Sequence, residues 1–185
     1  MSLRVTFELD ESDLEHFRLI MRAARQTAAR LAPEEVVAAA SARLLHLGER
    51  QPPAFVAERL EKLRLLIAML TDIDWRLPHR DARRVLSALT YFNETNDLIP
   101  DHVPGLGFLD DAIMIELVAR ELRHELDAYR DFRDFRREKS SELQSRPLTR
   151  RNKWLEARRS ELLERMRRRR QADDEENRPQ PGLFR

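Results

Sequence analysis

The chain lacks cysteine altogether, which excludes disulfide bonds and metal sites built from thiolates. Glycine occurs only 4 times, whereas alanine, leucine, glutamate and arginine are abundant, and this composition favours helices. No apolar run approaches the roughly 20 residues that a membrane-spanning helix needs. The N-terminal sequence MSLRVTFELDE also lacks the basic and then apolar layout of a secretion signal. We therefore expect a cytoplasmic protein without a transmembrane segment.

Charged residues make up 36% of the chain, and their signs are distributed unevenly along it. Residues 1–129 carry a net charge of −6, whereas residues 130–185 carry +7. The segment 146–170, called the basic arm below, holds 11 basic and 3 acidic side chains. An acidic body followed by a basic arm indicates that the arm binds a polyanionic partner or the body itself.

The hydrophobic spacing predicts an all-α fold, a small helical bundle, with one short β-strand at the N-terminus. Apolar and polar residues alternate over residues 3–9, which is the period of a strand. A first helix, capped by Asp10 or Ser12, then reaches about residue 31. Pro33 and Pro78 each open a helix, as proline favours the first helical position. The predicted helices after the first span about 33–48, 54–70, 78–92, 110–135 and 148–170.

Breaks at prolines divide the chain into four predicted segments. They are residues 1–50, a strand and a helical pair that could serve dimerisation; 54–139, the helical core; 146–170, the basic helix; and 171–185, a disordered tail. In the basic helix, only a thin apolar stripe is present, formed by Leu155, Leu162 and Met166. Such a narrow stripe predicts a helix that projects from the bundle or docks on it weakly.

The segment NDLIPDHVPGLGFLDD, residues 96–111, interrupts this helical pattern and is called the corner below. Pro100 and Pro104 disfavour helical backbone in the residue before each of them. Gly105 and Gly107 permit positive φ, and Asp110 is placed to cap the helix that follows. These five residues predict a structural corner that reverses one helix into the next.

The corner and the helix before it carry a pattern that resembles the YkvA family of small helical bacterial domains. The matching residues are Ala88-Leu89-x-Tyr91-Phe92, then DLIPD at 97–101 and PGLGFLDD at 104–111. The hallmark of the family is DLIPD-x-x-P-x-x-G-[YF]-x-DD. The resemblance covers about residues 72–129 and implies a helical domain and a bacterial origin, with no established reaction.

The chain departs from the YkvA pattern in two respects. Thr95 and Asn96 stand where family members often have a proline and an apolar residue. Many members are also hydrophobic enough here to suggest membrane association, whereas this chain is too charged for insertion. The resemblance therefore implies no catalytic residue. The charge of this chain argues against a membrane-inserted state.

The corner also carries the candidates for a metal site, which are Asp97, Asp101, Asp110 and Asp111. A sharp turn would bring these carboxylates together, and clusters of carboxylate oxygens hold Mg²⁺ or Ca²⁺. The alternative is structural: Asp110 caps a helix, Asp111 complements its dipole, and the other two accept hydrogen bonds from loop amides. The spacing does not match an EF-hand loop and no HExxH motif is present, so the structural interpretation is favoured.

The basic arm carries the candidates for binding a polyanion. They are Arg150, Arg151, Lys153, Trp154, Arg158, Arg159, Arg165, Arg167, Arg168, Arg169 and Arg170. Several phosphates neutralised by such a helix would give salt-sensitive binding without sequence preference, and the tryptophan is suited to stacking on a base or lying among lipid headgroups. The alternative is a solvated helix, in which Glu156, Glu161 and Glu164 balance part of the charge along one face.

The sequence thus predicts a non-catalytic interaction or scaffold protein, cytoplasmic or peripheral at a membrane surface. Its predicted partners are another protein or a second copy of the chain, and, through the basic arm, a nucleic acid or an anionic membrane surface. No cofactor is predicted unless the corner binds Mg²⁺ or Ca²⁺. The competing hypothesis is a metal-dependent enzyme that uses the carboxylates of the corner.

Overall fold

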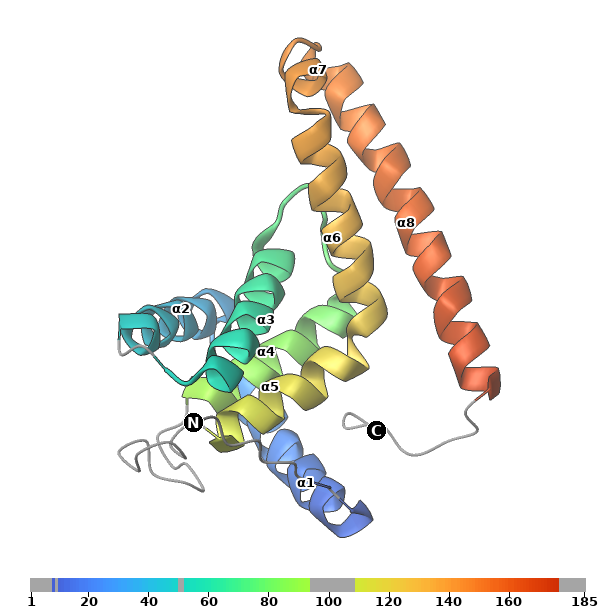
Figure 1. Ribbon diagram of the computed structural model, residues 1–185. Helices are drawn as coiled ribbons and strands as arrows, with labels where there is room; N and C mark the ends of the chain where they lie inside the picture. Colours follow the sequence, from blue (N-terminus) through green and yellow to red (C-terminus); the bar gives the residue numbers. More distant parts are fainter. Residues whose placement is uncertain (1–7, 9, 50–51, 94–108, 177–185) are drawn as a thin grey trace.

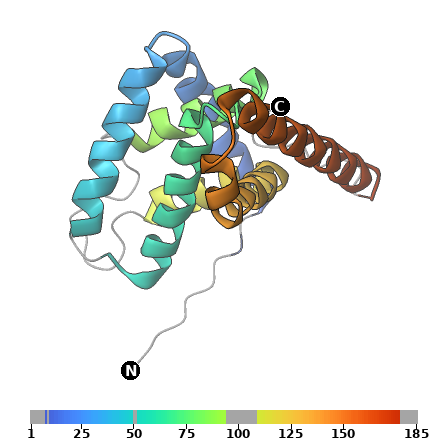
Figure 2. The same cartoon turned by 90° about the horizontal axis from the view of Figure 1, so that it is seen from above.

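The computed structural model describes residue 8 and residues 10–49, 52–93 and 109–176 of the chain. These ranges contain eight α-helices and no β-strand (Figure 1). The helices are α1 (Glu11–Ala28), α2 (Pro33–Glu49), α3 (Ala54–Thr71), α4 (His79–Asn93), α5 (Leu109–Glu121), α6 (Arg123–Glu138), α7 (Ser140–Gln144) and α8 (Leu148–Glu176). Helices α1 to α5 form a bundle, and α6 and α8 run side by side as a long hairpin that extends from it (Figures 1 and 2).

The predicted N-terminal β-strand is wrong, and the fold class is all-α without a strand. Glu8, which is the one described residue of the predicted strand 3–9, is not in a strand. The other residues of that segment lie outside the described residues. A strand needs a neighbouring strand to satisfy its backbone groups, and the described part of the chain consists of helices that offer none.

The helix starts follow the local signals in the sequence. At α1, Asp10 and Asp13 form a capping box: the amide of Asp13 donates to Asp10 Oδ1 at 2.9 Å, and the amide of Asp10 donates to Asp13 Oδ2 at 3.0 Å. Pro33 is the first residue of α2, and Pro78 directly precedes α4. The predicted cap at Asp10 and the predicted start at Pro33 are therefore confirmed.

Helix α4 is the centre of the bundle, since α1, α2, α3 and α5 all contact it. Val85, Leu89 and Phe92 are fully buried on it. Ser87 and Thr90 are buried as well, and each hydroxyl donates to the backbone carbonyl four residues earlier. Burial of these hydroxyls leaves no unpaired donor, because the helix itself accepts their hydrogen bonds.

The single helix predicted over 110–135 is divided into α5 and α6 at Leu122. Leu122 has φ of −99° and ψ of 20° and is completely buried. The backbone hydrogen bonds of the region continue through the bend, from the amide of Leu122 to Val118 and from that of Leu126 to Leu122. The bend lets α5 pack on α3 while α6 turns away to pack on α8 (Figure 1).

The prediction that the basic helix docks weakly is wrong, whereas its projection from the bundle is seen in the hairpin of α6 and α8 (Figure 1). Leu155, Leu162, Leu163 and Met166 of α8 are all buried and belong to the same hydrophobic core as the bundle. Leu163, which lies beside the predicted stripe, widens the face that packs on α6. Helix α8 also continues to Glu176, so residues 171–176 are helical and not part of a disordered tail. Residues 177–185 lie outside the described residues.

Candidate functional site

Most of the predicted corner lies outside the described residues. This applies to Asp97, Pro100, Asp101, Pro104, Gly105 and Gly107. Helix α5 begins at Leu109, so Asp110 lies within its first turn instead of preceding it. The structural and metal-binding roles assigned to the corner residues from 97 to 107 stay predictions.

Asp111 is the corner carboxylate whose surroundings the structure describes, and it is buried. Its Oδ2 lies 3.3 Å from Nη2 of Arg43, which comes from α2. The guanidinium of Arg43 also lies 5.2 Å from the centroid of the Phe92 ring on α4. Asp111 thus joins three helices through a charge pair, and its position in the first turn of α5 also complements the helix dipole.

The described side chains include no group of three or more histidines, aspartates or glutamates that could hold a metal ion. Of the four proposed metal ligands, Asp111 already pairs with Arg43. The structure does not describe Asp97, Asp101 or the side chain of Asp110. The metal hypothesis therefore depends on the residues that the structure does not describe.

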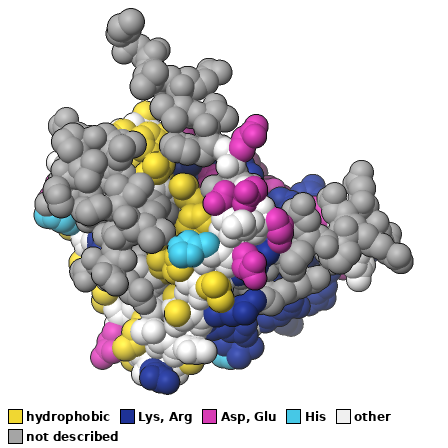
Figure 3. Space-filling view, turned by 90° about the horizontal axis from the view of Figure 1, so that it is seen from below, with side chains coloured by type: hydrophobic (Ala, Val, Ile, Leu, Met, Phe, Trp, Pro, Cys, Tyr) yellow, Lys and Arg dark blue, Asp and Glu magenta, His cyan; other side chains and the backbone are white. Residues whose placement is uncertain are grey.

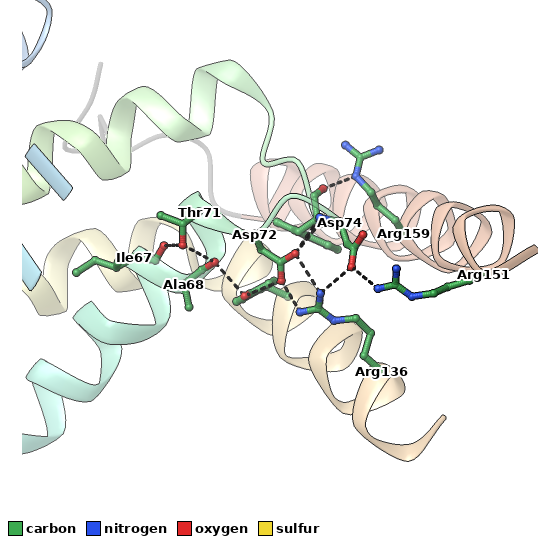
Figure 4. A network of polar contacts seen from close by, with 10 residues as sticks. Ile67, Ala68, Thr71, Asp72, Asp74, Arg136, Arg151 and Arg159 are labelled. Carbon is green, nitrogen blue, oxygen red and sulfur yellow. Dashed lines mark hydrogen bonds and ion pairs between the residues drawn. The ribbon is translucent and has the colours of Figure 1, made fainter. Parts of the chain in front are cut away.

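A polar network between the α3–α4 loop, α6 and α8 was not among the predicted sites (Figure 4). Asp72 lies at its centre, where its Oδ1 accepts hydrogen bonds from the amides of Asp74 at 3.0 Å and Trp75 at 3.1 Å. The same carboxylate accepts from Arg136 Nη1 at 3.1 Å and from the hydroxyl of Tyr129 at 3.0 Å. Asp72 therefore closes the turn after α3 and attaches it to α6.

The electrostatics of this network follow from its contacts. Burial alone would raise the pKa of Asp72, but the hydrogen bond and positive charge of Arg136 outweigh it and hold the pKa below its usual range. Burial, together with the charge of Asp72, raises the pKa of Tyr129 to about 12. A charged carboxylate and a neutral phenol are thus both favoured at neutral pH, which keeps the hydrogen bond between them.

The network continues onto the basic arm. Arg151 Nη2 lies 3.3 Å from Asp74 Oδ2. Arg159 donates to the backbone carbonyls of Trp75 and of Arg76, the latter at 2.9 Å. Arg76 has φ of 50°, in the left-handed region that non-glycine residues rarely occupy, and Arg159 bonds the carbonyls of this turn. No local pattern in the sequence signals these contacts, because the partners of Arg159 are 84 and 83 residues away.

Further residues of the basic arm attach α8 to α6. Arg165 pairs with Asp131, and the guanidinium of Arg158 lies 5.6 Å from the ring centroid of Phe135. The ring of Trp154 meets that of Phe135 edge to face at 5.3 Å. Arg158, Arg165 and Trp154 thus contact α6 within the hairpin, and their binding to a polyanion or a lipid headgroup layer stays a prediction.

Near the C-terminal end of α8, Arg170 enters a cluster of charges. Its Nη2 lies 3.3 Å from Oδ1 of Asp81 on α4, and it also pairs with Glu125 on α6. Both carboxylates are buried, with 3% and 1% of their residue surface exposed. Arg84 lies within 3.6 Å of Asp81 and 3.7 Å of Glu121. Arg170 thus holds the end of α8 on two other helices, and no sequence signal identified its buried partners.

The remaining cations among the predicted polyanion-binding residues face solvent. They are Arg150, Lys153, Arg167, Arg168 and Arg169, all of them exposed. Arg168 pairs with Glu164 one turn earlier on the same helix. Among the described side chains, the other four have no ion-pair partner. The structure thus divides the predicted polyanion-binding residues into a set that attaches α8 and a set that remains accessible.

The described elements define the protein as an all-helical bundle with a helical hairpin, and none of its described helices is long and apolar enough to cross a lipid bilayer. The family described as "Protein of unknown function (DUF1232)" matches residues 84–117, from α4 through the corner into α5. This match is consistent with the resemblance to the YkvA family. No curated protein and no solved structure matches the chain significantly. The comparisons therefore supply no activity.

Proposed function

We propose that the protein is a non-catalytic helical interaction protein whose basic helix α8 contacts a polyanionic partner. The observation that carries the proposal is the division of the cations on α8. Arg151, Arg159, Arg165 and Arg170 attach the helix to the rest of the fold. Arg150, Lys153, Arg167 and Arg169 remain exposed. A docked helix presents its outer cations at fixed positions, so less conformational entropy is lost on binding than with a disordered tail. The proposed setting is a bacterial cytoplasm, which the resemblance to the YkvA family supports.

The test neutralises outer cations of α8 in the full-length chain. We expect Arg150→Gln, Lys153→Gln and Arg167→Gln together to weaken binding to heparin, used as a generic polyanion, by on the order of tenfold at 0.1 M salt, since each neutralised contact weakens a salt-dependent interaction. The matched control replaces Arg22, Arg25 and Arg30, which are also exposed and lie on α1 or just after it. This control removes the same charge, and we expect less than a twofold effect. Equal weakening in both variants would show that net charge alone, and not α8, governs the binding.

A further inference from the structure

The cationic surface of α8 continues onto a part of the molecule that the sequence analysis did not single out. Arg80 and Arg83 lie in the first turns of α4 and are exposed. Arg76 lies in the loop just before α4, and 58% of its side-chain surface is exposed. Figure 3 shows one face of the molecule on which Lys and Arg side chains gather, with Asp and Glu side chains beside them.

Three contacts bring the start of α4 against α8. Arg76 pairs with Glu156 of α8, and Arg159 of α8 donates to the carbonyl of Arg76 at 2.9 Å. One turn later on α4, Asp81 lies 3.3 Å from Arg170 of α8. Arg80 and Arg83 are three residues apart, so they share one face of α4, in the same first turns whose Asp81 contacts α8.

The charges of this region also influence one another. Burial lowers the pKa of Arg159, and the positive charges of Arg76 and Arg167 lower it further. Like charges have this effect only when they lie close together. The charges of Arg76 and Arg167 are therefore both felt at the guanidinium of Arg159, which donates to the backbone carbonyls of Trp75 and Arg76.

The chemistry of this surface favours phosphate groups over a lipid interior. The large hydrophobic side chains that are exposed among the described residues are Leu19, Leu31, Leu45, Ile73 and Leu148. Ile73 lies in the α3–α4 loop with Arg76, and the other four lie neither on α4 nor on the C-terminal half of α8. A helix that inserts into a membrane surface needs an apolar face, and one isoleucine does not supply it. Guanidinium groups instead bind phosphate through paired hydrogen bonds.

The dimensions suit a nucleic acid. From Arg150 to Arg167 helix α8 extends about 26 Å, at roughly 1.5 Å per residue. This is the length of about seven base pairs of duplex, at roughly 3.4 Å each. Arginines spread over such a length can contact several successive phosphates of a nucleic acid. A single small anion can contact only one or two of these arginines.

We propose that Arg76, Arg80 and Arg83, together with Arg167 of α8, form one composite surface that binds the phosphate backbone of a nucleic acid. This inference rests on the proposed function, since it names the polyanion and extends the surface from α8 to α4. The binding follows phosphate spacing and has no base preference, because no aromatic side chain belongs to the surface.

The experiment measures fluorescence anisotropy of labelled 20-nucleotide random-sequence DNA, single-stranded and duplex, with the full-length protein over a range of salt concentrations. The α4 variant carries Arg80→Gln and Arg83→Gln, and its matched control carries Arg25→Gln and Arg30→Gln, which are exposed on α1 and the following loop. We expect the α4 variant to bind about tenfold more weakly at 0.1 M salt and to lower the salt slope by about 2, and the control to bind like the unaltered protein. Arg80→Lys with Arg83→Lys should retain the salt slope, and thermal unfolding by circular dichroism should be the same for all variants.

The outcomes separate this inference from the proposed function. If neutralising Arg150 and Lys153 weakens DNA binding while the α4 variant behaves like its control, the composite surface is wrong and the role of α8 stands. If the protein binds vesicles of phosphatidylglycerol and not DNA, the inference of a nucleic acid is wrong, whereas the proposed binding of a polyanion stands. If the protein binds neither, the proposed function and this inference both fail.

Discussion

Tyr129 shows how a single side chain couples the fold to pH. Its one O–H proton is shared between the carbonyl of Ala68 and Asp72 Oδ2, each 3.0 Å from the hydroxyl oxygen, and only the neutral phenol can donate it. The pKa is raised to about 12, above the value near 10 of an unfolded chain. The stabilisation by this group is therefore complete below about pH 10 and is lost as the pH rises through 12.

We expect Tyr129→Phe to lower the free energy of unfolding by about 1 kcal/mol at pH 8, because the hydrogen bond that its hydroxyl shares between Ala68 and Asp72 is lost from a buried site. Between pH 8 and pH 11 the unaltered protein should lose more stability than the variant, since the variant has no phenol to ionise. Urea denaturation at the two pH values measures both quantities. An identical loss in the two proteins would mean that Tyr129 does not contribute to the alkaline transition.

At the scale of a secondary-structure element, one charged side chain joins the C-terminal part of α8 to the bundle. Arg170 pairs with Asp81 and Glu125, which are both buried. Removing one partner of a buried charge pair leaves the other without compensation, which typically costs about 3–5 kcal/mol. The side chain of Arg170 is itself 27% exposed and Arg84 also lies near Asp81, so we expect a smaller effect here.

We expect Arg170→Met to lower the free energy of unfolding by roughly 2 kcal/mol, and to speed amide hydrogen exchange in the last turns of α8 before the rest of the bundle. The neighbouring Arg169→Met is the matched control, because Arg169 is exposed, and it should change stability by less than about 0.5 kcal/mol. Adding Glu125→Gln to Arg170→Met should recover part of the loss, since one buried charge is then removed. Equal effects at positions 169 and 170 would contradict the assigned ion pairs.

The elements differ in how well the sequence predicts them. Helix starts at Asp10 and Pro33 depend on capping and on proline geometry within a few residues, so a local pattern is sufficient. The bend at Leu122 has no such signal, because no proline or glycine is present and the backbone hydrogen bonds continue through it. The predicted strand at the N-terminus is the opposite case, because a local pattern is present but the structure does not follow it. Alternation of apolar and polar residues favours a strand only where a neighbouring strand can pair with it.

The contacts of the candidate site residues also depend on tertiary packing. The sequence shows the composition of the basic arm. It does not show which of its cations face the rest of the fold. Arg136 and Asp72 are 64 residues apart, and Arg170 and Asp81 are 89 apart, so only the packing of α6 and α8 brings them together. A charge run in a sequence therefore indicates a surface, whereas its accessible part is decided by tertiary structure.

For the whole molecule, acidic side chains of residues 1–129 form ion pairs with basic side chains of α8. Residues 1–129 are net acidic and 130–185 net basic, and α8 lies against the helices that carry acidic partners. Arg151–Asp74 and Arg170–Asp81 are such pairs. Arg123 of α6 also pairs with Asp173 of α8, and Arg165 pairs with Asp131 within residues 130–185. The asymmetry that suggested an external partner thus also stabilises the docked position of the arm.

This arrangement predicts that salt destabilises the folded protein. Partly exposed ion pairs are screened when the Debye length falls from roughly 14 Å at 0.05 M to about 4 Å at 0.5 M salt. We expect the free energy of unfolding, measured with uncharged urea, to fall by about 1 kcal/mol over this range, because several pairs between α8 and the body weaken together. The double variant Arg165→Gln with Asp131→Asn retains the net charge and lacks one pair, so its dependence on salt should be smaller. A protein whose stability rises with sodium chloride, with the double variant unchanged from the parent, would show that hydrophobic packing of Leu155, Leu162 and Met166 alone holds α8 in place.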